Sequence, residues 1–273
     1  MTASALRTRN LAAGYAGTGV LDGIDLDFAA RRITAIVGAN ACGKSTLLRA
    51  LARLLVPSRG QVLLDGRSIR DIAPKALARQ LGLLPQSPIA PEGISVLDLV
   101  GHGRHPHQRL FGGFTAADEA AVAEALDATG TRSLAQRDVT DLSGGQRQRV
   151  WIALALAQQT GVLLLDEPTT FLDINHQIEV LDLLAALNRD RGTTIVMVLH
   201  DLNLAARYAD RLVALRAGCV HSAGPPSEVL TEAMVREVFG LEALVMPDPL
   251  TGRPMIIPCS RSPTGRRASD RTP

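Results

Sequence analysis

Residues 38–46 of the chain read Gly38-Ala39-Asn40-Ala41-Cys42-Gly43-Lys44-Ser45-Thr46. They match the pattern G-x-x-x-x-G-K-[ST], in which a glycine-rich loop surrounds the phosphates of a nucleotide. The apolar run 33–37 before the loop predicts a buried strand, and the good helix formers 47–55 after it predict a helix. Glycines let successive backbone N–H groups point at phosphate oxygens, and the following helix adds its positive dipole end. This stretch therefore predicts a phosphate-binding loop between a strand and a helix.

The side chains of this loop have separate expected roles. Lys44 would reach the β- and γ-phosphates, and the Ser45 hydroxyl would bind Mg²⁺. Lysine occurs elsewhere only at position 75, so Lys44 is not one of many surface lysines. Cys42 would lie against the phosphates beside a lysine, which predicts a raised thiolate fraction.

Length and composition exclude several classes of protein. The chain has 273 residues, enough for one large or two modest domains, and its 46% hydrophobic content excludes a disordered protein. The net charge of +2 does not suggest a nucleic-acid partner. The three cysteines show no paired spacing, which fits a reducing cytosol. We find neither a signal peptide nor an apolar run long enough to cross a bilayer, so any membrane role would need a partner.

Two further apolar runs end in residues suited to phosphate chemistry. The run 162–165 predicts a buried parallel strand and is followed by Asp166 and Glu167. Ligands bind at the carboxyl ends of such strands, so Asp166 would hold Mg²⁺, directly or through water, and Glu167 would polarise the attacking water. The buried strand 193–199 precedes His200, which could hydrogen-bond the γ-phosphate.

The middle of the chain predicts a helical insertion, residues 86–159, with a small core of its own. Gln86 ends the predicted strand 81–86, and helical patterning then dominates from residue 95. Thr115 to Asp118 resembles a capping box that opens a helix at 119–129. The sequence Ser143-Gly144-Gly145-Gln146 precedes a predicted helix, 150–159, and would form a second anion receptor.

A lone tyrosine and a group of histidines each allow more than one functional interpretation. Tyr15 lies among glycines just upstream of the phosphate loop and is a candidate stacking surface for adenine, or else an ordinary loop tyrosine. His102, His105 and His107 invite a metal site, but no carboxylate or cysteine joins them and glycine and proline interrupt any helical face. We therefore favour a solvated loop there.

These residues together resemble an ATP-binding cassette (ABC) ATPase over roughly residues 6–258. The matching motifs are Tyr15 (A-loop), Gly38–Ser45 (Walker A), Gln86 (Q-loop), Leu142–Gln146 (signature), Asp166–Glu167 (Walker B), Asp173 (D-loop) and His200 (H-loop). Further segments of the sequence resemble the branch that imports iron–siderophore complexes, heme and vitamin B12. These segments are 169–174 with His176 and Gln177, 103–107, 200–203, 248–249 and 252–254.

The resemblance implies an α/β P-loop NTPase fold, with a RecA-like core sheet and flanking helices. Residues 1–86 would form an antiparallel β subdomain and the first part of the ATP-binding core. Residues 87–159 would form the helical subdomain that carries the signature, and 160–258 the rest of the core. Residues 259–273 are polar and aperiodic, so we expect a disordered tail.

The resemblance also implies the mechanism. Two copies would pair head to tail, so that ATP bound at 38–46 of one copy is covered by Ser143–Gln146 of the other. ATP and Mg²⁺ are the expected ligands, with Ser45, Gln86 and Asp166 at the metal. Glu167 would be the general base, and Lys44, Gln86, Ser143, Asp173 and His200 would complete the catalytic set.

The expected setting is the cytoplasmic face of the bacterial inner membrane. The homodimer would join two permease subunits and, through them, an extracytoplasmic substrate-binding protein, with a groove around 87–109 that accepts a short permease helix. The expected function is uptake of a metal chelate, most simply an Fe(III)–siderophore. Import of heme or vitamin B12, a soluble non-transport cassette, and an exporter cassette are the alternatives.

The phosphate loop departs from the family pattern at two positions. Ala39 stands where many members have proline, and Ala41 where many have glycine. If position 41 needed a positive φ, an alanine there would cost on the order of 1 kcal/mol.

Overall fold

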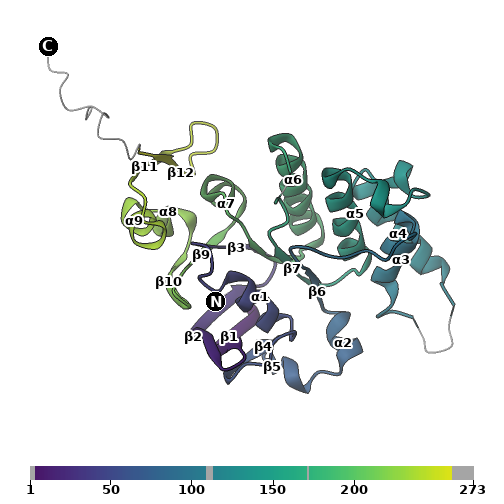
Figure 1. The fold of residues 1–273 in the computed structure, drawn as a ribbon, viewed down its shortest axis with the longest axis horizontal. Coiled ribbons are helices and arrows are strands. Elements are labelled where there is room, and N and C mark those ends of the chain that lie inside the picture. The colour runs from purple at the N-terminus through teal and green to yellow at the C-terminus, as the bar shows by residue number, and fades with distance from the viewer. Residues whose placement is uncertain (1–3, 109–112, 171, 260–273) are drawn as a thin grey trace, which may run out of the picture.

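A computed structural model of the chain describes residues 4–108, 113–170 and 172–259. The predicted tail therefore lies outside the described residues, apart from Cys259. Among the described residues, a sheet of six strands in the order β10-β9-β3-β8-β7-β6 forms the centre of the molecule (Figure 1). All neighbours in it are parallel except the β9–β10 hairpin. Its strands are β3 (Ile33–Gly38), β6 (Leu81–Leu84), β7 (Val162–Asp166), β8 (Thr194–Val198), β9 (Arg211–Arg216) and β10 (Cys219–Gly224).

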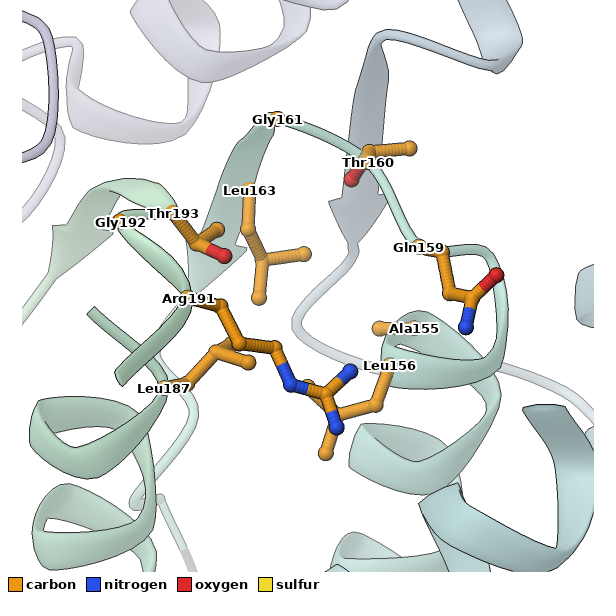
Figure 2. A pocket seen from close by; sticks show the side chains of 10 residues that line it. All are labelled: Ala155, Leu156, Gln159, Thr160, Gly161, Leu163, Leu187, Arg191, Gly192 and Thr193. Carbon is orange, nitrogen blue, oxygen red and sulfur yellow. The ribbon is translucent and has the colours of Figure 1, made fainter. Parts of the chain in front are cut away.

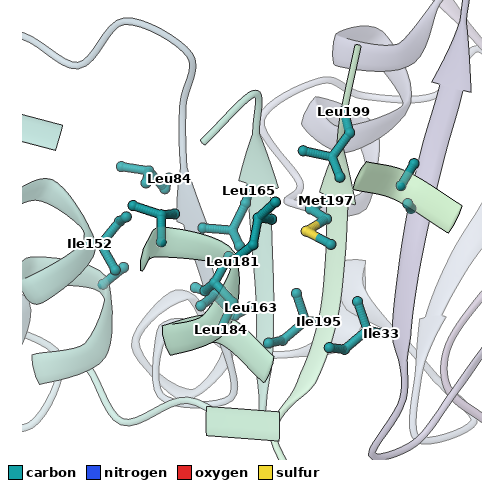
Figure 3. Packing of buried hydrophobic residues seen from close by; sticks show 14 of the residues in the cluster. Ile33, Leu84, Ile152, Leu163, Leu165, Leu181, Leu184, Ile195, Met197 and Leu199 are labelled. Carbon is teal, nitrogen blue, oxygen red and sulfur yellow. The ribbon is translucent and has the colours of Figure 1, made fainter. Parts of the chain in front are cut away.

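The central strands are buried on both faces, as their uninterrupted apolar sequences predict. In β7, Leu163 and Leu165 pack on the side of helices α5 (Gly144–Ala157), α6 (Ile174–Arg191) and α7 (Leu202–Tyr208), where Ile195 and Met197 of β8 join them (Figure 3). Val162 and Leu164 alternate to the opposite face. The predicted strands 162–165 and 193–199 and the predicted class of fold are thus confirmed.

The opposite face of the central sheet carries α1 (Lys44–Leu51) and a four-stranded antiparallel sheet (Figure 1). Strands in the order β2-β1-β4-β5 make this second sheet. β1 and β2 form an antiparallel hairpin near the N-terminus. The bounds are β1 (Ser4–Tyr15), β2 (Thr18–Ala29), β4 (Arg59–Leu64) and β5 (Arg67–Ser68); the short helix α2 (Pro74–Ala78) precedes β6.

Helices α3 (Val96–Gly101), α4 (Ala116–Ala128) and α5 form the helical region between β6 and β7. The capping box at Thr115 is confirmed, since the backbone N–H of Asp118 donates to Thr115 Oγ1 and that of Thr115 donates to Asp118 Oδ2. Because Thr115 is the N-cap, α4 begins three residues earlier than predicted.

The prediction that this helical region has a core of its own was wrong. Its buried side chains, such as Leu99 and Ile152, belong to the same apolar cluster as Leu163 of the sheet and Leu184 of α6. Helix α5 carries this continuity, because it packs both against α3 and α4 and against β6 of the sheet.

The C-terminal part adds α8 (Pro226–Val229), α9 (Glu232–Phe239) and a hairpin of β11 (Ala243–Pro247) and β12 (Pro254–Pro258). We did not predict this hairpin. It is fixed to α7 by Asn203, whose side chain accepts from the Ile256 N–H at 2.7 Å and donates to its carbonyl at 3.2 Å. None of the described helices combines the length and apolar character needed to cross a bilayer.

Candidate nucleotide site

The phosphate loop lies where predicted, between the end of β3 and the start of α1. The backbone of Gly43 has φ 107°, a conformation that favours glycine, and a Cβ there would lie 2.7 Å from Leu21 Cδ2. Ala41 also has a positive φ, 60°. Many members of the family have glycine at this position, and an alanine with a positive φ strains the loop by roughly 1 kcal/mol.

Lys44 is the first residue of α1, so the helix begins three residues earlier than predicted. Its side chain is buried, and Nζ donates to the carbonyls of Gly38 and Ala39, each at 2.9 Å. The ammonium thereby joins the start of α1 to the first two residues of the phosphate loop.

A hydroxyl and a carboxylate meet beside the lysine. Ser45 Oγ donates to Asp166 Oδ1 at 3.0 Å, joining α1 to the end of β7. Burial and then the nearby charge of Glu167 raise the pKa of Asp166 above its usual range, against the opposing effect of the Ser45 hydrogen bond. Hydroxyl and carboxylate oxygens, such as those of Ser45 and Asp166, are the ligands that Mg²⁺ prefers. The residues therefore fit a divalent cation.

Glu167 is the point at which three strand ends converge. Its Oε2 accepts from Gln86 Nε2 at 2.6 Å and from Thr170 Oγ1 at 3.0 Å, while His200 Nε2 lies 2.6 Å from its Oε1. Gln86 follows β6 and His200 follows β8, the two strands that flank β7. The backbone of Glu167 has φ 54°, an uncommon conformation for a residue with a side chain of this size.

A cavity of about 620 Å³ is lined by nine of the predicted site residues. The residues that line it are Val20, Asn40, Ala41, Gly43, Lys44, Ser45, Thr46, Gln86, Glu167 and His200. We did not predict Val20, because it lies in a strand whose alternating pattern gives no sign of a ligand. Nor did we assign Thr170 a role, although its place three residues after Glu167 suits a local hydrogen bond.

The expectation for Cys42 was wrong. Its side chain is buried, and burial raises the pKa of the thiol above its usual range, against the lowering effect of Lys44. A buried, protonated thiol is unreactive, so Cys42 serves the packing of the loop.

Tyr15, His102, His105 and His107 do not line this cavity. Tyr15 is exposed, and its hydroxyl accepts from Arg49 Nη1 at 3.2 Å. The rings of His102 and His105 lie with centroids 4.7 Å apart, and His107 Nε2 is 2.8 Å from the carbonyl of Gln158. In the described part of the chain, no three metal-ligating side chains form a cluster.

The signature turn, residues 142–146, does not line the cavity; Ser143 and Gly144 are exposed, whereas Leu142 is buried. Ser143 is the N-cap of α5, so this helix begins at Gly144 and not at the predicted residue 150. Its Oγ accepts from the Gln146 N–H at 3.3 Å, and the Ser143 N–H donates to Gln146 Oε1 at 3.2 Å. Asp173 is likewise an exposed N-cap, at the start of α6. The chain thus holds two groups of predicted residues in two separate places.

A different cavity, of about 280 Å³, lies near the opposite end of β7 and contains none of the predicted residues (Figure 2). Gly161 just before β7 and Thr193 just before β8 line it, and the Arg191 side chain extends across it towards Leu156. Glu167, Lys44 and His200 instead line the cavity at the edge of the sheet where the parallel strands end.

The structure combines a central sheet of mainly parallel strands, the phosphate loop, the Ser45–Asp166 pair, and Glu167 directly after Asp166. Together these features define a P-loop ATPase. The chain belongs to the ABC transporter family, whose model matches residues 21–170. It is 51% identical to the achromobactin transport ATP-binding protein CbrD of Dickeya dadantii, covering 97% of this chain and 99% of that one. It is 48% identical to the ferric enterobactin transport ATP-binding protein FepC of Escherichia coli, covering 94% and 95%. A solved transporter assigned to the metal-chelate type, in an inward-facing conformation, superposes with a TM-score of 0.82 at 30% identity, covering 94% of this chain and 98% of that one.

Proposed function

We propose that this chain is the ATP-hydrolysing subunit of a bacterial importer that takes up a metal chelate, with an Fe(III)–siderophore complex as the cargo. The names of the relatives support the cargo, since they include transport of ferric enterobactin. The observation that supports the chemistry is the contact of Glu167 with both Gln86 and His200, beside the loop that holds Lys44.

Ser45 and Asp166 would hold Mg²⁺, with Gln86 as a further oxygen ligand. When bound, Mg²⁺ supplies positive charge that offsets the charge on the phosphate oxygens. Lys44 would exchange its loop carbonyls for phosphate oxygens and keep its position above β3. Phosphoryl transfer needs mainly positioning and electrostatic stabilisation, and both come from groups already held in place here.

Glu167 would act on the attacking water as general base. Its two oxygens contact Gln86, Thr170 and His200 in this structure, and these contacts compete with an attacking water for the carboxylate. We infer that Gln86 and His200 turn towards the nucleotide and thereby free Glu167. The same movement would couple nucleotide binding to the helical region, which begins just after Gln86.

A complete site would need two copies of the chain. Ser143–Gln146 form an anion-binding helix start that does not line the cavity containing Lys44. Two copies related by a two-fold axis would place each signature turn over the other copy's nucleotide. Closure of this dimer on ATP, followed by hydrolysis, would drive the transport cycle.

The permease would bind the helical region. A groove of about 630 Å³ lies between α3 and α4, and Leu97, His102, His105 and Phe114 contribute to its wall. Leu97 and Phe114 expose much of their apolar surface, which suits a short amphipathic helix from a permease subunit. We therefore place the chain at the cytoplasmic face of the inner membrane, joined to two permeases and, through them, to a substrate-binding protein.

The substitution Glu167→Gln tests the chemistry. It removes the base but keeps the shape, so the variant should bind ATP, lose turnover by at least about 100-fold and accumulate as an ATP-bound dimer. Turnover by radioactive phosphate release and mass by light scattering would be measured together. Glu228→Gln, at an exposed position of α8, is the control. Near-normal ATP hydrolysis by Glu167→Gln would show that Glu167 is not the general base.

The cargo requires a separate experiment. The chain, its permease and its binding protein would be reconstituted in vesicles, and ATP turnover would be measured with the binding protein loaded in turn with a ferric siderophore, heme or cobalamin. Stimulation by the ferric siderophore alone is expected. Stimulation by cobalamin or heme instead would contradict the proposed cargo without affecting the proposed ATPase chemistry.

A further inference from the structure

His176, in the first turn of α6, contacts both of the exposed motifs that lie outside the nucleotide cavity. On one side, its Nδ1 lies 2.8 Å from Asp173 Oδ1, which also accepts from the His176 N–H at 2.9 Å. These hydrogen bonds hold the pKa of Asp173 below its usual range. Nδ1 therefore carries the proton in this contact, and Asp173 is fixed in direction by two donors from a single residue.

On the other side, the imidazole ring lies beside the signature turn. A Cβ built on Gly145 would be 3.6 Å from both Cγ and Cδ2 of His176, and 3.7 Å from Leu172 Cδ2. The His176 ring is thus the group nearest to the position that a side chain at Gly145 would occupy. About a third of the His176 side chain is exposed, 34%, so the ring closes the gap between the two motifs without being deeply buried.

Two further contacts join the same two segments. Gln148 Nε2, in α5, donates to the Pro168 carbonyl at 2.9 Å, and Arg149 pairs with Glu179 of α6 at 3.5 Å. The start of α5 is therefore connected at three places to the stretch from Pro168 to Glu179. Of these three contacts, only that of His176 reaches a signature residue and Asp173 at once.

We propose that His176 is a positioning residue that fixes the signature turn and Asp173 relative to each other, so that both are presented to a second copy of the chain as one preformed surface. This inference rests on the proposed two-copy site. An imidazole suits the task because it combines a donor at Nδ1 with a flat apolar face. Asparagine can supply the donor alone, and phenylalanine the ring alone.

The experiment compares His176→Ala, His176→Asn and His176→Phe in the full chain carrying Glu167→Gln, in which ATP-bound dimers do not turn over. ATP affinity would be measured at protein concentrations too low for dimers, and dimer affinity by analytical ultracentrifugation with saturating ATP. His221→Ala is a matched control, since His221 Nε2 pairs with Glu237 at 2.8 Å far from both motifs. Unfolding midpoints of all variants would be recorded.

We expect ATP affinity of the monomer to stay within about twofold for every variant, because His176 does not line the nucleotide cavity. Dimer affinity should fall about tenfold in His176→Ala, the size of one lost charge-assisted hydrogen bond, and recover partly in the other two variants. Unchanged dimer affinity in His176→Ala overturns the inference, as does a loss that follows the unfolding midpoint. If the Glu167→Gln parent itself forms no ATP-bound dimer, that result contradicts the proposed two-copy site and therefore also the role of His176.

Discussion

The buried ion pair between Arg104 and Asp118 gives the most quantitative prediction. Arg104 Nε donates to Asp118 Oδ1 at 2.9 Å, and the two side chains are only 6% and 5% exposed. Arg104 Nη1 also donates to the Ala157 carbonyl at 2.7 Å and to Gln159 Oε1 at 3.0 Å. The pair therefore connects the start of α4 to the last turn of α5.

The size of the effect follows from the pKa of Asp118. The hydrogen bond from Arg104, followed by those from Thr115, lowers this pKa from 3.8 to about 2. Each pKa unit is equivalent to about 1.4 kcal/mol, so the ionised carboxylate contributes roughly 2 kcal/mol at neutral pH. Because the folded pKa is depressed, this contribution is present above the unfolded pKa and is lost as the pH falls towards 2. About half of it remains at pH 3.

We therefore expect Asp118→Asn to lower the free energy of unfolding by roughly 2 kcal/mol at pH 7 and by about half as much at pH 3. Trp151, the one tryptophan of the chain, lies buried in α5 and reports on this region. Urea unfolding would be followed by its fluorescence at each pH. Asp127→Asn is a matched control in the same helix, since Asp127 pairs with Arg132 at the surface and should contribute little. Equal losses in both variants, or a difference that does not narrow in acid, would refute the reasoning.

Two further predictions concern the phosphate loop. Lys44→Ala should raise the ATP dissociation constant by about 10- to 100-fold, as expected for a lost charge-assisted contact, while Lys75→Ala should leave it unchanged; calorimetry would measure both, and an unchanged constant in Lys44→Ala would contradict the loop assignment. Cys42 should alkylate far more slowly than the exposed Cys219 and Cys259, with or without ATP, because it is buried and its pKa is raised. Mass spectrometry would follow the labelling, and fast labelling of Cys42 would contradict its burial.

The sequence was sufficient for the strands and residues at the nucleotide edge of the sheet. Apolar runs without polar interruption predict strands that are buried on both faces, and the residues after them then lie together at the carboxyl edge. Asp166, Glu167 and His200 follow such strands, and the glycine-rich loop follows another. Their arrangement could therefore be predicted before any side-chain contact was known.

Features that depend on packing could not be predicted in this way. Cys42 lies two residues before Lys44 in sequence, and only the fold reveals that burial outweighs the effect of that charge on the pKa of the thiol. Helix α5 begins at Gly144 because a hydrogen-bonded cap at Ser143 compensates for two glycines that disfavour a helix. The β11–β12 hairpin depends on Asn203, more than 40 residues away in sequence, and local patterns carry no sign of that contact.

The order of strands in the central sheet has a consequence for how the protein is made. β3 and β7 both border β8 and do not touch each other, although β8 is the last of the three to be synthesised. Until Thr194 and the rest of β8 have been translated, β3 with its phosphate loop and β7 with Asp166 have no strand between them that could align them. A nascent chain, or a fragment truncated before β8, would therefore leave the apolar edges of both strands open, and chaperones would be expected to bind it at that stage.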